Sequence, residues 1–496
     1  MLNDWIWFSL FLFSFGVFLF TADLLRKKNW LPAEATRKLV HILTGIAVFF
    51  SPFLIHSKLP PLILALIFIV FNLFSIRKNW FSGIHSAGRH SYGTVYYPVA
   101  FGILVFFYWD TQVYIMQVSM LILAFGDAFA AIVGKNIQFK TEFTLHHSPK
   151  SLEGSSTMFL VSFLCVFGCG YFHILPEIPV LHLFLLSTII AFFASLAEAL
   201  FDGGLDNISI PLISALFLDY ILPDINVIFD VWVISAGILP VIYLFYRLRF
   251  LSAGGSVATF ILAVIMLGMG GWNWMFPLFI FFLLSSLLSF ASHHFRRSAG
   301  EIVEKTGARD AIQVLANGGP ALIILILAMN NLWPWAYAIF LVSVAAATSD
   351  TWSTEIGQLF SKGQPFDLFR MKKVEKGISG GMSFAGTLGG LLGSATIASL
   401  VFFQNDLYVE RPEDMWILIT VCGFLGMVSD SFLGSYFQGH YQCSVCGQET
   451  EKSNHCGQPG NIIKGYRFIN NDTVNFIGIS FAIIFGIIGY NLFYKM

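Results

Sequence analysis

The sequence predicts an all-α protein, a polytopic membrane helical bundle with about 14–16 transmembrane helices. Hydrophobic residues make up 56% of its 496 positions and charged residues only 11%, whereas soluble domains carry about 25% charged residues. Apolar runs of roughly 20 residues, the length that crosses a bilayer as a helix, recur along the whole chain. Clear examples are residues 5–25, 113–133, 181–200 and 474–494.

The net charge of the chain indicates which classes of partner to expect. The formal net charge is only −1 and the chain has no basic tail, so we expect no nucleic-acid partner. The membrane is the predicted environment, and the sequence identifies no protein partner.

Charges around the first apolar run predict the orientation. Residues 1–4 carry no positive charge while residues 26–28 are all basic, so we expect a retained helix rather than a cleaved signal peptide. The positive-inside rule then places the N-terminus outside and the loop after this helix in the cytoplasm. Alternating the later spans puts Lys140 and Lys372 inside, together with the Gly-rich polar segments, and puts Asp110 and Asn273 outside.

The predicted cytoplasmic clusters recur in the same order, each pair roughly half a chain apart. This spacing favours two parallel copies of a similar helical bundle, which we assign to residues 1–225 and 226–496. The matched pairs are Arg89 with Arg309, Asp127 with Asp350, Lys150–Ser155 with Lys376–Gly381, and Asp206 with Asp430.

Each half holds acids suited to Mg²⁺, basic side chains for phosphate charge, and glycines that allow close backbone approach. Phosphoryl transfer needs these parts, because its catalysis is mainly positioning and charge neutralisation. Residues 150–155 also open a predicted helix whose N-terminal amides can receive a phosphate. Helix capping by Asp127 and headgroup contact by Lys150 are the alternatives. No Walker P-loop is present, since Asn136 follows Gly134 and Lys135.

Spaced motifs in the first half are Arg37-Lys38-Leu39-Val40-His41, Gly126-Asp127-Ala128 with Gly134-Lys135, Lys150–Ser155, Glu198, and Asp206-Asn207 with Pro211. With them, residues 30–222 resemble the dolichol kinase and phytol kinase family. The resemblance implies an integral membrane kinase that uses CTP as donor, with Mg²⁺, on a long isoprenoid alcohol.

The second half carries its own motifs, at residues 253–256, 309–319, 349–357, 377–381, 430–434 and 471–475. Residues 235–490 thereby resemble a family long catalogued as a domain of unknown function, which includes plant phytyl-phosphate kinase. One departure is that Ile378 and Ser379 stand where that family's loop leads us to expect Thr-Asp. If that Asp is a metal ligand, the second half has lost it.

The two resemblances together imply a bifunctional kinase. Residues 1–225 would convert an isoprenoid alcohol, phytol-like or a polyprenol, to its monophosphate, and residues 226–496 would add the second phosphate. Fusion raises the effective concentration of the intermediate at the second site. A CTP-dependent lipid cytidylyltransferase and a membrane transporter are the alternatives; against a transporter, the polar groups gather at one face rather than at the bilayer midplane.

Site residues are assigned on this basis. Arg37 and His41, four apart on one helical face, are expected to meet the alcohol, Lys150 the donor phosphates, and Arg309 a phosphate. The catalytic candidates are Arg37, His41, Asp127, Lys150, Glu153, Asp202, Asp206, Asn207, Arg309, Asp310, Asp350, Glu355 and Asp430. The nucleotide-binding candidates are Gly126, Gly134, Lys135, Ser151, Gly154, Gly380 and Gly381, and the Mg²⁺ candidates are Asp127, Asp206, Asp350 and Asp430.

A cysteine cluster stands apart from these motifs. Cys443 and Cys446 form a C-x-x-C pattern, and His455 and Cys456 follow. This is the ligand pattern of a zinc site in a reducing compartment, with His440 or His455 as the fourth ligand. Adjacent His455 and Cys456 are not expected to bind one ion readily, and free thiols in a tight turn are the alternative.

Overall fold

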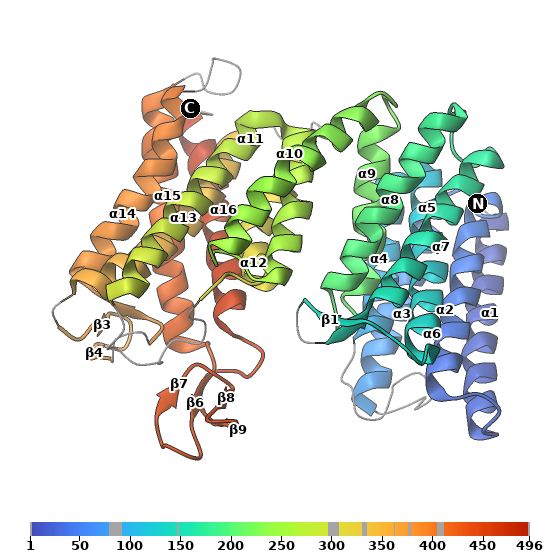
Figure 1. Ribbon diagram of the computed structural model, residues 1–496, viewed down its shortest axis with the longest axis horizontal. Coiled ribbons are helices and arrows are strands. Elements are labelled where there is room, and N and C mark those ends of the chain that lie inside the picture. The colour runs from blue at the N-terminus through green and yellow to red at the C-terminus, as the bar shows by residue number, and fades with distance from the viewer. Residues whose placement is uncertain are drawn as a thin grey trace. The chain divides into compact units, whose positions relative to one another are not determined.

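The computed structural model describes residues 2–78, 92–145, 148–295, 307–329, 335–361, 363–374, 378–403 and 411–494. These residues form two compact units, Met1–Val233 and Ile234–Met496 (Figure 1). Eleven of the described helices are long and apolar enough to cross a membrane. The predicted all-α, polytopic membrane fold is therefore confirmed.

Unit one is a bundle of helices to which the described residues add one small hairpin. Its helices are α1 (Leu2–Lys27), α2 (Ala33–Phe50), α3 (Leu59–Lys78), α4 (Gly93–Tyr108), α5 (Val113–Leu121), α6 (Ala128–Asn136), α7 (Leu152–Tyr171), α8 (Val180–Leu200) and α9 (Asp206–Ile221), with a 3-10 turn η1 (Ser51–Phe53). Strands β1 (Glu142–Thr144) and β2 (Pro149–Ser151) pair antiparallel directly before α7.

The segment from α5 to α6 is the buried centre of unit one. In its most apolar stretch, 72% of the residues are buried. In the corresponding stretch of α1 only 11% are buried, because the large hydrophobic side chains of α1 face outward. Between α5 and α6 the chain forms a π-helical turn, η2 (Ile122–Asp127), that ends at Asp127. Such turns widen a helix locally and occur often at functional sites, because they re-aim the side chains beside them.

Unit two is also built mainly of long helices. They are α10 (Val227–Arg247), in which the division between the units falls, α11 (Ala253–Phe295), α12 (Ala311–Met329), α13 (Ala336–Phe360), α14 (Phe384–Ala398) with the 3-10 turn η3 (Ser399–Phe403), α15 (Pro412–Tyr436) and α16 (Asn471–Tyr494). Helix α11 is two helices joined at Gly271, whose φ of 68° lies in the left-handed region that favours glycine. The turn lies within the predicted link near Asn273.

Helix α13 is the centre of unit two. Every residue from 336 to 349 is buried, and many are Ala or Ser. Small side chains let neighbouring helices approach closely in a membrane, where packing rather than hydrophobic burial holds helices together. Glycines of α14 and α15 meet this helix directly, since a Cβ at Gly423 would touch the Cβ of Ala345.

Short strands lie between the later helices of unit two. One sheet has the order β4–β3–β5 and joins β3 (Phe366–Asp367), β4 (Lys372–Lys373) and β5 (Gly381–Met382). Between α15 and α16 a second sheet, in the order β10–β6–β7, and a hairpin β8–β9 are formed by β6 (His440–Gln442), β7 (Glu449–Thr450), β8 (Asn454–His455), β9 (Gln458–Pro459) and β10 (Asn461–Lys464).

One local arrangement occurs in both units. In unit one, Ser151 caps α7 by accepting a hydrogen bond from the Gly154 amide at 3.1 Å, and a Cβ on Gly134 would lie 2.7 Å from that hydroxyl. In unit two, Ser383 caps α14 in the same way, accepting from the Gly386 amide at 3.1 Å.

Gly357 of unit two corresponds to Gly134 of unit one. A Cβ on Gly357 would lie 3.1 Å from the Ser383 hydroxyl. Gly134 follows Asp127, and Gly357 follows Asp350, by the same number of residues. The two units therefore share a helix–hairpin–helix arrangement around these acids.

This arrangement corrects two of the sequence pairings. The cap at Ser151 corresponds to Ser383, which lies beyond the predicted partner segment 376–381, of which residues 376 and 377 are outside the described residues. Asp206 begins α9, whereas Asp430 lies inside α15, so these two acids do not occupy matching positions. Arg89 also lies outside the described residues.

Candidate functional site

Unit one contains a cavity of about 1330 Å³ that combines a polar end with an apolar wall. Its polar lining comes mainly from α2, the π-helical turn η2, α6, the β1–β2 hairpin, α8, the turn after α8 and the start of α9. It includes Glu34, Arg37, Lys38, His41, Asp127, Lys135, Lys150, Ser151, Glu198, Asp202, Asp206 and Asn207. Its apolar lining includes Phe15, Leu19, Leu64, Phe68, Ile76 and Phe101 of α1, α3 and α4.

The buried ion pair of Lys38 and Asp127 lies at the polar end. Lys38 Nζ donates to Asp127 Oδ2 at 2.5 Å and to the Asp127 carbonyl at 3.2 Å, which fixes α2 against the π-helical turn. His41 Nε2 lies 4.0 Å from the same carboxylate oxygen and, although buried, has no hydrogen-bond partner among the described residues. An edge-on contact with Tyr97, with ring centroids 4.8 Å apart, holds the imidazole in place.

Sequence reasoning missed Lys38. It assigned Arg37 and His41 from their spacing of four, but Lys38 also shares a face with His41, at a spacing of three. Arg37 instead pairs with Glu34 at 2.8 Å, and Lys135 contacts the other oxygen of Glu34 at 2.7 Å. Arg37 and Lys135 thus form one group at the cavity, bridged by a carboxylate.

A second, partly buried ion pair joins the hairpin to α8. Lys150 Nζ donates to Glu198 Oε1 at 2.6 Å and to the Glu198 carbonyl at 2.7 Å, and the Ser155 hydroxyl donates to Glu198 Oε2 at 3.3 Å. Burial alone would lower the pKa of Lys150, but the carboxylates of Glu198 and Asp206 raise it further than burial lowers it. Lys150 is therefore held as a cation at the cavity.

The turn between α8 and α9 brings three more predicted residues to the cavity. Gly203 and Gly204 have φ of 64° and 99°, so the chain reverses sharply there. Asp202 Oδ2 accepts from the Ser148 amide at 3.0 Å, which ties this turn to the hairpin. Asp206 and Asn207 follow and line the cavity, and the charge of Asp206 interacts with those of Asp127 and Lys150.

Two predicted residues do not line this cavity. The Glu153 carboxylate accepts from the Thr141 amide at 3.0 Å and so fastens the hairpin to α7. Gly126 packs against α7, where a Cβ would lie 2.7 Å from Met158 Sδ. Both residues support the walls of the site, and neither faces its interior. Gly134, Ser151 and Gly154 do line the cavity.

The donor set of this cavity fits a magnesium–phosphate group. Carboxylate oxygens are ligands that Mg²⁺ prefers, and it is usually held by one or two carboxylates together with substrate phosphates. Asp127 and Asp206 supply two such carboxylates, while Lys38 and Lys150 supply positive charge beside them. The Ser151 cap also places the first amides of α7 at this end of the cavity.

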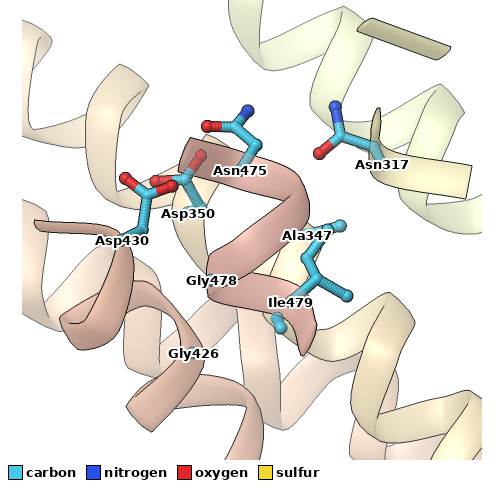
Figure 2. Close-up of a pocket in the computed structure, with 9 residues that line it drawn as sticks. Asn317, Ala347, Asp350, Gly426, Asp430, Asn475, Gly478 and Ile479 are labelled. Atoms are coloured by element: carbon cyan, nitrogen blue, oxygen red, sulfur yellow. The ribbon is translucent and has the colours of Figure 1, made fainter. Parts of the chain in front are cut away.

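Unit two has a small pocket, about 10 Å³, where α12, α13, α15 and α16 meet (Figure 2). Its polar lining is Asn317, Asp350, Asp430 and Asn475, one residue from each helix. With its amide oriented to match its neighbours, Asn475 donates to Asp430 Oδ2 at 3.1 Å and to the Asn471 carbonyl at 3.0 Å.

Within the part of the chain that the structure describes, the acids of this pocket have no basic partner. No Lys, Arg or His among the described residues forms an ion pair with Asp350 or Asp430, whereas Asp127 of unit one is paired with Lys38. Figure 2 shows the two carboxylates and the Asn475 amide gathered together. Two half-buried carboxylates that line one pocket repel each other when both are charged, and a cation relieves that repulsion, so the pocket suits one metal ion. Asn317 and Asn475 were not predicted as site residues.

Other predicted residues of unit two lie outside that pocket. The Arg309 guanidinium stacks over the rings of Phe281 and Phe282, at 5.3 and 5.2 Å from their centroids. Asp310 caps α12 by accepting from the Gln313 amide at 3.0 Å. Glu355 accepts from the Ser289 hydroxyl at 2.8 Å.

The glycine loop before α14 also lies apart from the pocket lining. Gly380, with φ of 86°, packs on Ser435 of α15, and Gly381 lies in β5 against Val374. Cys443, Cys446, His455 and Cys456 lie together in the segment between α15 and α16.

Comparison of the sequence with known proteins finds a family and several relatives of this chain. Residues 236–483 match a family model described as integral membrane protein DUF92. The chain is 33% identical over 216 residues to phytol kinase of Synechocystis sp., covering 43% of this chain and 90% of that protein. It is 28% identical over 260 residues to Protein PGR of Arabidopsis thaliana, covering 47% and 87%. An uncharacterized membrane protein of Methanocaldococcus jannaschii is 31% identical over 194 residues, covering 38% and 76%. No solved structure matches the chain.

Proposed function

We propose that this chain, which belongs to the DUF92 family of integral membrane proteins, is a membrane kinase that phosphorylates an isoprenoid alcohol. Its similarity to phytol kinase, over 90% of that protein, supports the class of reaction and of substrate. The observation that carries the proposal is the cavity of unit one, in which lysines and acids share one space with aromatic and aliphatic side chains.

This cavity suits an amphipathic substrate. A long isoprenoid alcohol needs an apolar wall for its chain and a polar end for its hydroxyl group. Phe15, Phe68 and Phe101 supply apolar wall, and the ion pairs of Lys38 and Lys150 supply the polar end. A water-soluble substrate would have no use for the apolar lining.

The polar residues of this cavity would have different roles in phosphoryl transfer. Asp127 and Asp206 would hold Mg²⁺, which when bound neutralises charge on the transferred phosphate. Lys150, kept cationic by Glu198, would bind the donor phosphates. Lys38 orients Asp127 by donating one hydrogen bond to its carboxylate and one to its backbone carbonyl. His41 Nε2 is the unpaired buried nitrogen beside Asp127, and it would accept the proton of the alcohol as the new bond forms.

We assign the second phosphorylation to unit two. Asp350 and Asp430, with Asn317 and Asn475, would hold the metal ion there, and the product of unit one would be its substrate. The absence of a basic partner for these acids among the described residues supports a cation at this pocket. By the charge pattern of the loops, we place both polar sites on the cytoplasmic side, with the N-terminus outside.

The donor and the reaction are tested together. We propose CTP as donor, so that purified protein given an isoprenoid alcohol and CTP labelled at the γ position yields labelled lipid mono- and diphosphate. A cytidylyltransferase would transfer CMP and release pyrophosphate instead. Label reaching the lipid from the α position would therefore contradict the kinase, and transfer from ATP alone would correct the donor.

A further inference from the structure

The segment between α15 and α16 gathers four metal-binding side chains that phosphoryl transfer does not use. Cys443 and Cys446 flank the turn after β6, and His455 and Cys456 lie at the turn between β8 and β9. One ligand atom from each lies within 4.8 Å of every other. Among the residues that the structure describes, no other group of three or more His, Cys, Asp or Glu side chains meets in this way.

The distances match those of a tetrahedral zinc site. Zinc bonds of about 2.3 Å to sulfur and about 2.0–2.1 Å to nitrogen separate two such ligands by roughly 3.6 Å in a tetrahedron. His455 Nδ1 lies 3.5 Å from Cys446 Sγ and 3.3 Å from Cys456 Sγ. These atoms have no covalent link, because all six cysteines are free.

The backbone explains how adjacent residues can serve one ion. Cys456 and Gly457 have φ of 53° and 75°, and this left-handed pair turns the chain so that the side chains of His455 and Cys456 converge. The sequence led us to expect that these neighbours do not readily bind one ion, but this turn brings their ligand atoms close enough to do so. A similar turn follows Cys446, where Gly447 has φ of 73° and the Val445 amide donates to Cys443 Sγ at 3.4 Å.

We propose that Cys443, Cys446, Cys456 and His455 Nδ1 bind one structural Zn²⁺ ion. Three thiolates and one imidazole favour zinc over the hard cations Mg²⁺ and Ca²⁺, which prefer oxygen ligands. Four protein ligands fill a tetrahedron and leave no open position for a substrate, so the ion is structural and not catalytic. This inference does not depend on the proposed kinase activity.

The zinc site positions a buried acid that reaches a neighbouring loop. Glu451 follows β7, whose partner β6 leads directly to Cys443. Its carboxylate accepts from the Ser379 amide at 2.6 Å and from Gln438 Nε2 at 2.8 Å. Ser379 precedes Gly380, which packs against α15. Zinc thereby holds the β6–β7 hairpin in place and, through Glu451, fixes the loop that leads into α14.

The first experiment measures metal in the intact wild-type chain. Full-length protein without a polyhistidine tag, purified in detergent and dialysed against EDTA, should retain about one zinc ion per chain. A thiol-directed mercurial should release that zinc from the folded protein. Zinc that is substoichiometric, or that EDTA removes freely, would mean an adventitious ion only and would overturn the proposal.

Matched variants locate the ion and test its effect. Cys446→Ser and Cys456→Ser should each lose the zinc, while Cys422→Ser, at a buried cysteine of α15, should keep it. Hydrogen exchange of the peptide that contains Ser379 should accelerate in Cys446→Ser, and also in Glu451→Gln, which should keep its zinc. Loss of zinc from Cys422→Ser would refute the ligand set. Unchanged exchange at Ser379 in Cys446→Ser would refute the link to the loop.

Discussion

Lys38 Nζ donates to Asp127 Oδ2 at 2.5 Å, and through this contact α2 meets the π-helical turn at the centre of unit one. Both side chains are buried. Removing one partner of such a pair leaves an uncompensated buried charge, whereas removing both can leave stability nearly unchanged. Comparing single and double variants of this pair can therefore separate its contribution to stability from its contribution to catalysis.

The first prediction uses that difference. Lys38→Met should lower the free energy of unfolding by about 3–5 kcal/mol, because Asp127 is left buried and unpaired. The double variant Lys38→Met/Asp127→Asn should recover most of that stability, measured by thermal unfolding in detergent, yet remain inactive. Lys27→Met, which breaks the pair between the exposed Lys27 and Asp23 on the same helix, is the control and should change stability by less than about 1 kcal/mol. If the double variant is active, Asp127 is not required for catalysis.

The second prediction concerns Lys150 and pH. Glu198 raises the pKa of Lys150 in opposition to burial, so Lys150 stays protonated well into the alkaline range. Glu198→Gln removes the largest of the charges that raise this pKa, so the lowering effect of burial is opposed by less. The alkaline limb of the pH–rate profile should then move to lower pH, since the required cation is lost as pH rises through the reduced pKa. An alkaline limb in the same place as in the wild type would show that Lys150 does not have to be charged.

Several site residues were predictable from the sequence, because acids and lysines beside Gly-rich turns are costly at a membrane unless they have a use. Asp127, Lys150 and Asp206 were found in this way, and all three line the cavity. Lys38 and Glu198 were not assigned, because their importance comes from partners distant in the sequence. Lys38 bonds across 89 positions and Lys150 across 48, and no local spacing reveals either contact.

The helical membrane fold was predictable from hydropathy, but the residues of unit two that correspond to those of unit one were not. The all-α membrane bundle follows from apolar runs alone. The match between Ser151 and Ser383 depends instead on helix capping and on loops of different length, which shift the register after Asp127 and Asp350. The equal spacing from these acids to Gly134 and Gly357 was visible in the sequence, but its meaning required the packing seen in the structure.

The third prediction tests those glycines. An added Cβ at Gly357 would lie 3.2 Å from the Gly386 Cα, a backbone atom with little room to move. Gly357→Ala should therefore lower the unfolding free energy by about 1–3 kcal/mol, through overpacking. Gly319→Ala, in α12 with no atom within 4 Å of the new Cβ, is the matched control and should be neutral or stabilising by up to about 1 kcal/mol. Equal thermal shifts in the two variants would refute the close helix contact.

The fourth prediction tests orientation by thiol labelling in intact cells. Cysteines placed at Lys140 and Lys372 should resist a membrane-impermeant reagent, whereas cysteines at Asp110 and Asn273 should react, because positive loops stay in the cytoplasm. All four positions are exposed, so accessibility within the fold does not limit the reaction. The parent protein, with its own exposed Cys446 and Cys456, gives the background signal. Labelling of Lys372 and Asn273 positions to the same extent would contradict the topology.

The fifth prediction assigns the second phosphorylation to Asp350 and Asp430. These acids line one pocket without a basic partner among the described residues, so the charge that binds a metal ion is theirs alone. Asp350→Asn should lower conversion of monophosphate to diphosphate by about 10²-fold or more, a loss of the size seen when one electrostatic contact to the transition state is removed. Labelled monophosphate should accumulate, because Asp127 and Lys150 are untouched. Asp414→Asn, at the far end of α15 in an exposed pair with Arg411, is the matched control and should convert monophosphate normally. If Asp350→Asn instead abolishes phosphorylation of the alcohol as well, both steps share one site and the division of labour between the two units is wrong.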